Sequence, residues 1–428
     1  MDHHLSERAL AYFDELFPLE APVMPAIAHQ PVSDEPDIVG EITGFDAFGT
    51  KTVCDTANGI PYFINEFWTS GQRRGHSLHE ISYRACFKPQ LPEFFISRLT
   101  SPGDAVYDPF MGRGTTLVQA ALQGRRPIGN DVNPLSTLLV RPRLNPPHLG
   151  SITAALANVP WGRTVNLRDE LLVFYHTETL RRLTVLREYL FEQAPLDCHQ
   201  PDPALDWIRM VAINRLTGHS PGFFSVYTLP PNQAVSVESQ RRINERRGQK
   251  PEQRDIDRII LKKTKSLLAD GMMPIHPPGS TMIGQASCSP AIPSGEVSLV
   301  VTSPPFLDIV QYAKDNWLRC WFAGIDTASV QIDMLKNEAA WTAMVRETLR
   351  ELARVVRPNG HVAFEVGEVR GGKVLLERLV WKAADGLPFD RLGVMVNQQE
   401  FTKTANCWGV NNNNAGTNTN RIVLLRRS

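Results

Sequence analysis

Short apolar runs of strand length alternate along much of this chain with segments whose apolar positions recur at helical spacing. Residues 297–301 form a β-branched run typical of a buried strand. Further strands are predicted at 104–108, 127–130, 361–366, 392–396 and 421–425, and helices at 94–99, 115–122, 133–140, 338–356 and 373–384. This alternation predicts an α/β fold built on a sheet.

The pattern changes between the strand that ends near Asp131 and the next one near Met282. Helical periodicity dominates there, at 165–195, 206–216 and 236–268. We therefore expect a mainly helical insert within the α/β fold. The predicted divisions are an acidic N-terminal arm (1–50), a first α/β part (51–145), the insert (146–280) and a second α/β part (281–428).

The strand predicted at 297–301 leads into Thr302-Ser303-Pro304-Pro305-Phe306. Proline cannot donate to a strand ladder, so the chain must leave the sheet at Ser303. In open α/β sheets this carboxyl end is where ligands bind. A hydroxyl, free carbonyls and an aromatic ring are suited to accepting two hydrogen bonds from an amino group and stacking on a flat ring. A simple strand-ending turn is the alternative interpretation.

A second stretch, Asp104 to Thr116, predicts a strand, a glycine turn and a helix. Gly112 and Gly114 allow a tight turn and a close approach of the backbone to a ligand, and Thr115 or Thr116 is placed to begin the helix. Asp131 follows the next strand, about twenty positions later, a spacing that suits an acid binding ribose hydroxyls.

These stretches resemble motifs of a known family. Residues 108–116 (DPFMGRGTT) and 302–306 (TSPPF) are similar to motifs I and IV of the DNA amino-methyltransferases; residues 87–92 (FKPQLP) resemble motif X, and 281–286 (TMIGQA) motif III. The resemblance covers roughly 76–140 and 280–428. It implies a Rossmann-like methyltransferase sheet with an inserted target-recognition region, in the motif order X–I–IV.

The resemblance also implies S-adenosyl-L-methionine as the cofactor, with motif X closing over its methionine end. The family often has Asp where this chain has Gln285, whose carbonyl oxygen can still accept a hydrogen bond. The predicted cofactor-binding residues are Lys88, Pro89, Asp108, Pro109, Phe110, Gly112, Gly114, Thr115, Thr116, Asp131, Asn133, Gln285 and Ala286.

The predicted catalytic residues are Ser303, Pro304, Pro305 and Phe306. In this family a Ser-Pro-Pro-aromatic motif is most often associated with methylation of cytosine N4, whereas Asp or Asn in the first position is more usual for adenine N6. The order of the motifs favours adenine instead. We expect an N4-cytosine DNA methyltransferase that acts on a flipped base in a restriction–modification or defence context. Adenine N6 methylation, RNA amine methylation and a non-catalytic DNA-binding subunit are the alternatives.

Charge is distributed unevenly although the formal net charge is zero. Residues 1–50 hold ten acids and one arginine, whereas residues 209–265 hold twelve Lys or Arg against five Asp or Glu. A localised basic face is expected to contact DNA phosphates, with a solvated helix as the alternative. The predicted DNA-binding residues are Arg241, Arg242, Arg246, Arg247, Lys250, Trp408, Asn411 and Asn412.

Six scattered cysteines form no CxxC pair, and His76 and His79 have no third partner, so no disulfide framework and no metal site is predicted. The chain has neither an apolar run of membrane-spanning length nor a signal peptide. We expect a cytoplasmic protein whose partners are double-stranded DNA and a cognate restriction enzyme. Nothing in the sequence indicates an oligomeric state.

Overall fold

The computed structural model describes residues 37–69, 75–83, 86–198, 200–228, 234–271, 273–274, 276–307, 312–327, 330, 335, 337–369, 373–398 and 419–428. All of them belong to one compact unit, Pro36–Ser428. Three of the residues predicted to bind DNA, Trp408, Asn411 and Asn412, lie outside the described residues.

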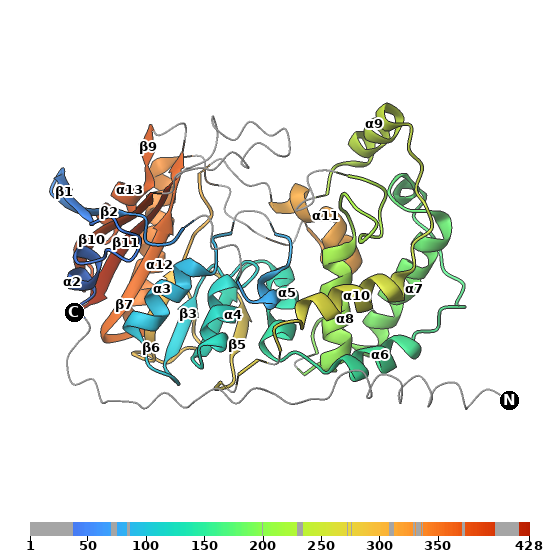
Figure 1. The fold of residues 1–428 in the computed structure, drawn as a ribbon, viewed down its shortest axis with the longest axis horizontal. Coiled ribbons are helices and arrows are strands. Elements are labelled where there is room, and N and C mark those ends of the chain that lie inside the picture. The colour runs from blue at the N-terminus through green and yellow to red at the C-terminus, as the bar shows by residue number, and fades with distance from the viewer. Residues whose placement is uncertain are drawn as a thin grey trace. The chain divides into compact units, whose positions relative to one another are not determined.

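The centre of the fold is a mainly parallel sheet of nine described strands, in the order β1-β2-β10-β11-β7-β6-β3-β4-β5 (Figure 1). Strands β3, β4, β5, β6 and β7 pair in parallel, whereas β11 is antiparallel to both β7 and β10. The strands are β1 (Val53–Ala57), β2 (Ile60–Asn65), β3 (Ala105–Asp108), β4 (Arg126–Asp131), β5 (Ser280–Ile283), β6 (Val297–Thr302), β7 (Val356–Val366), β10 (Phe389–Gln398) and β11 (Thr419–Arg427). This arrangement confirms the α/β, Rossmann-like fold class. A separate pair is formed by β8 (Glu368–Val369) and β9 (Val374–Leu375).

Helices cover both faces of the sheet, because alternate strand residues face opposite ways. In β11, Ile422 and Leu424 pack with one group of helices, and Val423 and Leu425 with another. The first group includes α2 (Ile38–Thr43), α3 (Gln90–Leu99) and α4 (Thr115–Leu122); the second comprises α12 (Glu338–Val355) and α13 (Leu376–Ala383). Burial of β6 on both faces explains why all of 297–301 but Ser298 is apolar.

The region between β4 and β5 is mainly helical. It contains α5 (Pro134–Leu144), α6 (Leu149–Ala157), η2 (Asp169–Val173), α7 (Thr177–Gln193), α8 (Pro203–Arg215), α9 (Val237–Arg247) and α10 (Ile256–Leu267). Figure 1 shows α6, α7, α8 and α10 grouped to the right of the sheet, with α5 between. Helix α8 is central: Trp207 is fully buried and donates to Thr264 of α10 (3.0 Å). The same core takes in side chains of α11 (Tyr312–Ala323).

Three local features differ from the pattern-based expectation. Ile38 and Ile42 of α2 are buried in the core, although they fall in the predicted arm. Strand β7 begins at Val356, five residues before the strand predicted at 361–366; its pairing with β6 shifts register between Val297 and Leu299, and Asn359 in this stretch has a φ of 62°. The β1–β2 hairpin was not predicted, although its Asn58-Gly59 turn is a recognised hairpin signal.

Candidate active site

The two principal motifs meet at the carboxyl ends of β3 and β6. These neighbouring parallel strands pair Tyr107 with Val300, so Asp108 and Thr302 emerge at the same sheet edge. The Thr302 hydroxyl donates to Asp108 Oδ1 at 2.6 Å. The Thr116 hydroxyl at the start of α4 donates to the Val301 carbonyl at 3.0 Å. Two side-chain bonds therefore join segments that lie almost two hundred residues apart.

Asp108 is a buried anchor of the glycine loop. Its side chain is 1% exposed, and Oδ1 also accepts from the Phe110 amide at 3.1 Å. Burial raises the pKa of this carboxyl to about 7, and the bonds from Thr302 and Phe110 oppose that rise. Asp108 thus fixes the direction in which the chain leaves β3, whether or not a cofactor touches it.

The glycine loop takes a backbone form that side chains disfavour. Gly112 and Gly114 have φ values of 47° and 75°. A Cβ at Gly114 would lie 2.5 Å from Val140 of α5, whereas one at Gly112 would meet nothing closer than the Tyr83 ring, at 3.6 Å. Gly114 therefore permits the tight packing of the loop on α5, and Gly112 leaves an open approach to the backbone.

Asp131, at the end of β4, faces this loop. Its Oδ2 accepts from the Gly112 amide (2.8 Å) and its Oδ1 from the Asn133 amide (2.9 Å). Burial raises the pKa of this carboxyl and these two bonds lower it. An ionised carboxylate has about four acceptor positions, so both oxygens keep capacity for a ligand.

Other predicted cofactor residues have structural partners as well. The Asn133 side chain caps α5 by accepting from the Leu135 amide (3.1 Å), and Thr115 Oγ1 accepts from Arg113 (3.1 Å). Strand β5 brings Gln285 and Ala286 to the same edge, because the Gly284 amide donates to the Asp131 carbonyl (3.0 Å). Gln285 is exposed and Ala286 is buried.

Ser303 follows β6 directly and is half-buried. Its hydroxyl bonds to the carboxylate of Glu365. The Pro305 carbonyl accepts from Trp341 of α12 at 2.9 Å, and Phe306 packs on the core beside α12. Glu365 thus contacts the first residue of this segment, and α12 contacts the last two.

Glu365 is a candidate site residue that the sequence analysis missed. Thr302 pairs with Phe364 of β7, so Glu365 lies one residue further along, at the level of Ser303. The carboxylate is 5% exposed and accepts from Asn420 of β11 (2.9 Å). Burial raises its pKa, and the bonds from Ser303 and Asn420 lower it. A lone acid inside the apolar run 362–366 was the available signal, because buried acids are rare without partners.

The predicted lid is tied to the glycine loop through Arg113. This guanidinium donates to the carbonyls of Ile81 (3.0 Å) and Phe87 (3.5 Å). Pro89 stands at the start of α3, directly after Lys88. The described residues 76–83 and 86–89, which we call the strap, therefore lie alongside the loop that carries Gly112.

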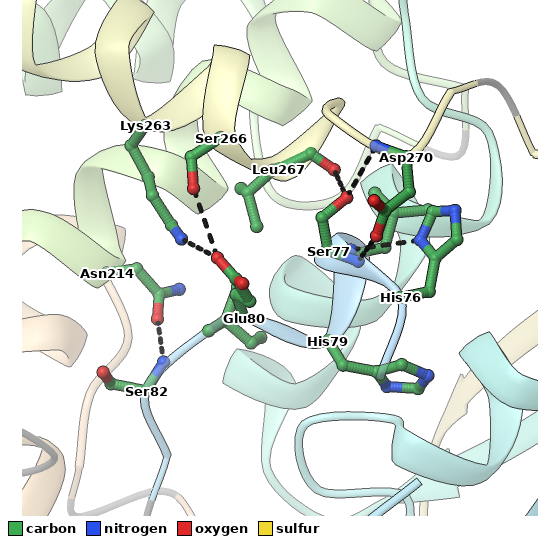
Figure 2. Close-up of polar contacts among 12 residues, drawn as sticks. His76, Ser77, His79, Glu80, Ser82, Asn214, Lys263, Ser266, Leu267 and Asp270 are labelled. Carbon is green, nitrogen blue, oxygen red and sulfur yellow. Dashed lines mark hydrogen bonds and ion pairs between the residues drawn. The ribbon is translucent and has the colours of Figure 1, made fainter. Parts of the chain in front are cut away.

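The strap also contacts the helical region (Figure 2). Ser77 donates to the Leu267 carbonyl (2.8 Å), and the Ser82 amide donates to Asn214 of α8 (3.0 Å). Glu80 accepts from Lys263 (3.4 Å) and from Ser266 (3.2 Å), both on α10. These bonds link the insert directly to the segment that packs on the glycine loop.

His79 in the strap is a core residue. It is buried, and its Nε2 pairs with Gln119 of α4 at 3.1 Å. Burial and the nearby Arg143 lower its pKa to about 3, so the ring is neutral. Within the part of the chain that the structure describes, no three His, Cys, Asp or Glu side chains gather as a metal site would need. No helix there is long and apolar enough to cross a membrane.

The predicted basic residues lie on and after α9. Arg241, Arg242, Arg246, Arg247 and Lys250 are all exposed, and Gln240 is the buried residue of this helix. Among the described residues, none of these five forms an ion pair. The Arg247 guanidinium stacks on Tyr227 at 3.8 Å. A helix without an apolar face contributes little to a core, which leaves its arginines available to a partner.

A cavity of about 1120 Å³ lies elsewhere, between α5 and the edge strand β5. Leu144, Met273, His276 and Ile283 are among the residues that line it. None of the predicted site residues does.

Residues 56–136 match the model of a protein family described as DNA methylase, the N6/N4 methyltransferases. The chain is 44% identical over 69 residues to the type II methyltransferase M.MjaII of Methanocaldococcus jannaschii, which covers 16% of this chain and 13% of that protein. It is 31% identical over 117 residues to the type II methyltransferase M.MvaI of Kocuria varians; this match covers 27% of this chain and 24% of that protein. It is 41% identical over 59 residues to the orphan methyltransferase M.BamHII of Bacillus amyloliquefaciens, covering 13% and 22%. The chain thus spans at most about a quarter of the length of these relatives.

Among solved structures, the rRNA methyltransferase AviRa of Streptomyces viridochromogenes matches with a TM-score of 0.30 and 14% identity, over 82% of this chain and 90% of that one. A geranyl diphosphate C-methyltransferase of Streptomyces coelicolor A3(2) matches with a TM-score of 0.30 and 9% identity, over 79% and 75%. Likenesses this weak add nothing to the assignment. The likeness of this chain to the DNA methylase family rests on the match of residues 56–136 and on the three sequence relatives.

Proposed function

We propose that this protein is an S-adenosyl-L-methionine-dependent DNA methyltransferase that modifies the exocyclic N4 amine of cytosine. The observation that carries the proposal is the meeting of two motifs at one sheet edge. The glycine loop, Asp131 and Ser303-Pro304-Pro305-Phe306 follow the carboxyl ends of β3, β4 and β6, and Thr302 is bonded to Asp108.

The residues present fit the proposed cofactor. Gly112 leaves its backbone open to close approach, and Asp131 keeps acceptor capacity suited to two ribose hydroxyls. The bound cofactor supplies a methyl group on a positively charged sulfur. The protein's task is to present the amine in line with that methyl group, because alignment accounts for much of the rate enhancement in such transfers.

The proposed role of the catalytic segment is to make a poor nucleophile better. The amine lone pair of a base is delocalised into the ring. Ser303 Oγ and the Pro304 carbonyl accept its two N–H bonds, which favours a pyramidal nitrogen and stabilises the positive charge that develops on it. Phe306 stacks on the base, which has to leave the duplex to reach the site.

Glu365 completes this arrangement. Its carboxylate accepts a hydrogen bond from the Ser303 hydroxyl, which leaves the oxygen lone pairs of Ser303 directed at the amine. The methylated amine carries one proton too many. As that proton passes to Ser303 Oγ, the hydroxyl proton of Ser303 passes to Glu365, and charge balance is restored.

The basic helix α9 supports DNA as the substrate. Its exposed arginines have no ion-pair partner among the described residues, which suits phosphate contacts. The names of the relatives include both type II and orphan methyltransferases, so a restriction enzyme as partner stays a prediction.

The test is nucleoside mass spectrometry of DNA from cells that express the protein, beside a Ser303→Ala control. We expect N4-methylcytosine with the wild type and a loss of about a hundredfold or more in the control. Detection of N6-methyladenine instead would identify adenine, and not cytosine, as the target base. Methylated RNA with unmodified DNA would contradict the DNA proposal, and full activity of Ser303→Ala would remove this residue from the mechanism.

A further inference from the structure

Arg215, the last residue of α8, is a partly buried cation without a counter-ion. Its Nε donates to the Asn214 carbonyl (2.9 Å), and its guanidinium lies 4.1 Å from the centre of the Phe223 ring. Among the described residues, Nη1 and Nη2 have no hydrogen-bond partner and no carboxylate pairs with this side chain. Burial, and after it the charge of Arg319, lower its pKa to about 10. A partly buried cation without a counter-ion has lost part of its hydration, and a ligand of opposite charge would offset that loss.

Two more cations lie within electrostatic range of Arg215. Arg319 of α11 is 7% exposed; it donates to the Ser82 carbonyl (3.0 Å) and to Asn316 (2.9 Å). Lys263 of α10 has its pKa lowered by burial and by Arg215, although Glu80 partly compensates it. The carboxylate of Asp315 acts on Arg319 from the same helix. Helices α8, α10 and α11 thus each contribute a cation to one region. Among the described residues, Arg215 is the one of these three whose Nη atoms make no hydrogen bond.

This place lies on the path from the insert to the reacting atoms. Figure 2 shows Ser82 bonded to Asn214 of α8 and Glu80 bonded to Lys263 of α10, where the strap meets these two helices. The next strap residue, Tyr83, approaches Gly112 of the glycine loop. Helix α11, which carries Arg319, begins nine residues after Ser303. Arg319 also lies over the Tyr83 ring, so an anion bound to Arg215 would lie near the strap residue that faces the glycine loop.

We propose that Arg215, supported by Arg319 and Lys263, binds a phosphodiester group of the DNA strand that carries the target base. This inference rests on the proposed function and deepens it by naming the contact that anchors the strand beside the site. The planar guanidinium presents two free N–H donors, the geometry that suits two phosphate oxygens. Anchoring one phosphate next to the catalytic segment fixes the position from which the base is extruded.

The test is the salt dependence of duplex DNA binding by the full chain. Each phosphate bound by the protein adds about 0.9 to the slope of log K against log salt. We expect Arg215→Gln to lower this slope by about one and Arg215→Lys to keep it. Arg163→Gln is the matched control: Arg163 lies in the same helical region but is paired with Glu192 at 2.6 Å, so its slope should not change.

Thermal unfolding distinguishes a phosphate-binding role of Arg215 from a purely structural one. Without DNA, Arg215→Gln should unfold at the same temperature as the wild type or higher, because it removes a cation that repels Arg319 and Lys263. A lower unfolding temperature with an unchanged slope would overturn the proposal. An unchanged slope with weaker S-adenosyl-L-methionine binding would identify the cofactor carboxylate as the anion instead. A lowered slope in a protein that methylates no DNA would keep the phosphate site and reject the proposed function.

Discussion

Thr302 donates a hydrogen bond of 2.6 Å to Asp108, although 194 residues separate them in the chain. Asp108 ends the strand before the glycine loop, and Thr302 ends the strand before Ser303. One short bond therefore fixes the distance between the proposed cofactor loop and the proposed catalytic segment. A shift of either strand end would move the methyl donor relative to the amine, a displacement to which transfer reactions are sensitive.

The buried Asp108 carboxyl should make the stability of the protein depend on pH. Its pKa is about 7 in the folded protein, against about 4 for an unfolded chain. The folded state therefore favours the protonated form. Its stabilising contribution is fully present below about pH 4 and is lost as the pH rises through about 7. The free energy of unfolding should fall in this window by up to about 1.4 kcal/mol per pH unit.

Urea unfolding at a series of pH values measures this dependence. The Asp108→Asn variant, whose side chain is neutral and of nearly the same size, should lose the part of the decline between pH 4 and 7 that belongs to Asp108. A variant whose stability falls as steeply as that of the wild type would show that Asp108 is ionised in the folded protein throughout.

Asp131→Ala should weaken cofactor binding by about ten- to a hundredfold. The substitution removes the proposed ribose acceptor and also the partner of the Gly112 amide, and a hydrogen bond to a charged group contributes about 1.5–3 kcal/mol. Isothermal titration with S-adenosyl-L-methionine gives the dissociation constant. The dissociation constant of Asp131→Asn, which retains one acceptor oxygen, should lie between those of the wild type and Asp131→Ala. A wild-type dissociation constant for Asp131→Ala would show that another residue holds the ribose.

Glu365→Gln should reduce turnover by about a hundredfold or more and leave cofactor binding intact. The pKa of Glu365 is raised by burial, so wild-type turnover should rise as the pH increases through that raised value and the carboxylate becomes a base. The variant should lack this rise because its amide does not ionise. The measurement is single-turnover methylation against pH. If Glu365→Gln keeps both the rate and the pH profile of the wild type, Glu365 holds Ser303 without moving protons.

Replacing Arg241, Arg242, Arg246 and Arg247 by alanine should weaken DNA binding in a salt-dependent way. The slope of log K against log salt should fall by about 0.9 for each phosphate group that the variant no longer binds. The folded protein should lose little stability, since these side chains are exposed and surface changes usually alter the free energy of unfolding by about 0.5 kcal/mol or less. Arg350→Ala, an exposed arginine on α12, is the control. An unaltered slope in the fourfold variant would show that the α9 arginines do not bind DNA phosphates.

Much of the local structure could be predicted from the sequence alone, because its causes are local. The glycine turn leads into a helix at Thr115–Leu122, as expected, and the apolar run at 297–301 is β6. The proline pair ends that strand because proline cannot donate to the ladder. Gly112, Gly114 and Asp131 were identified from spacing, and the fold brings them together. Helical periodicity likewise predicted α7, α8, α9 and α10 of the insert, but not α6.

The tertiary structure decided which distant side chains meet. Glu365 reads in the sequence as a lone buried acid, yet the fold brings both Ser303 and Asn420 of β11 to its carboxylate. Arg113 has no distinguishing sequence signal in the glycine turn but binds the strap, and Arg215 reads as an ordinary helix-end arginine until α11 places Arg319 near it. Periodicity and turn chemistry report on neighbours within a few residues. Burial, pKa and unpaired charge depend on strand order and helix packing, which are properties of the whole fold.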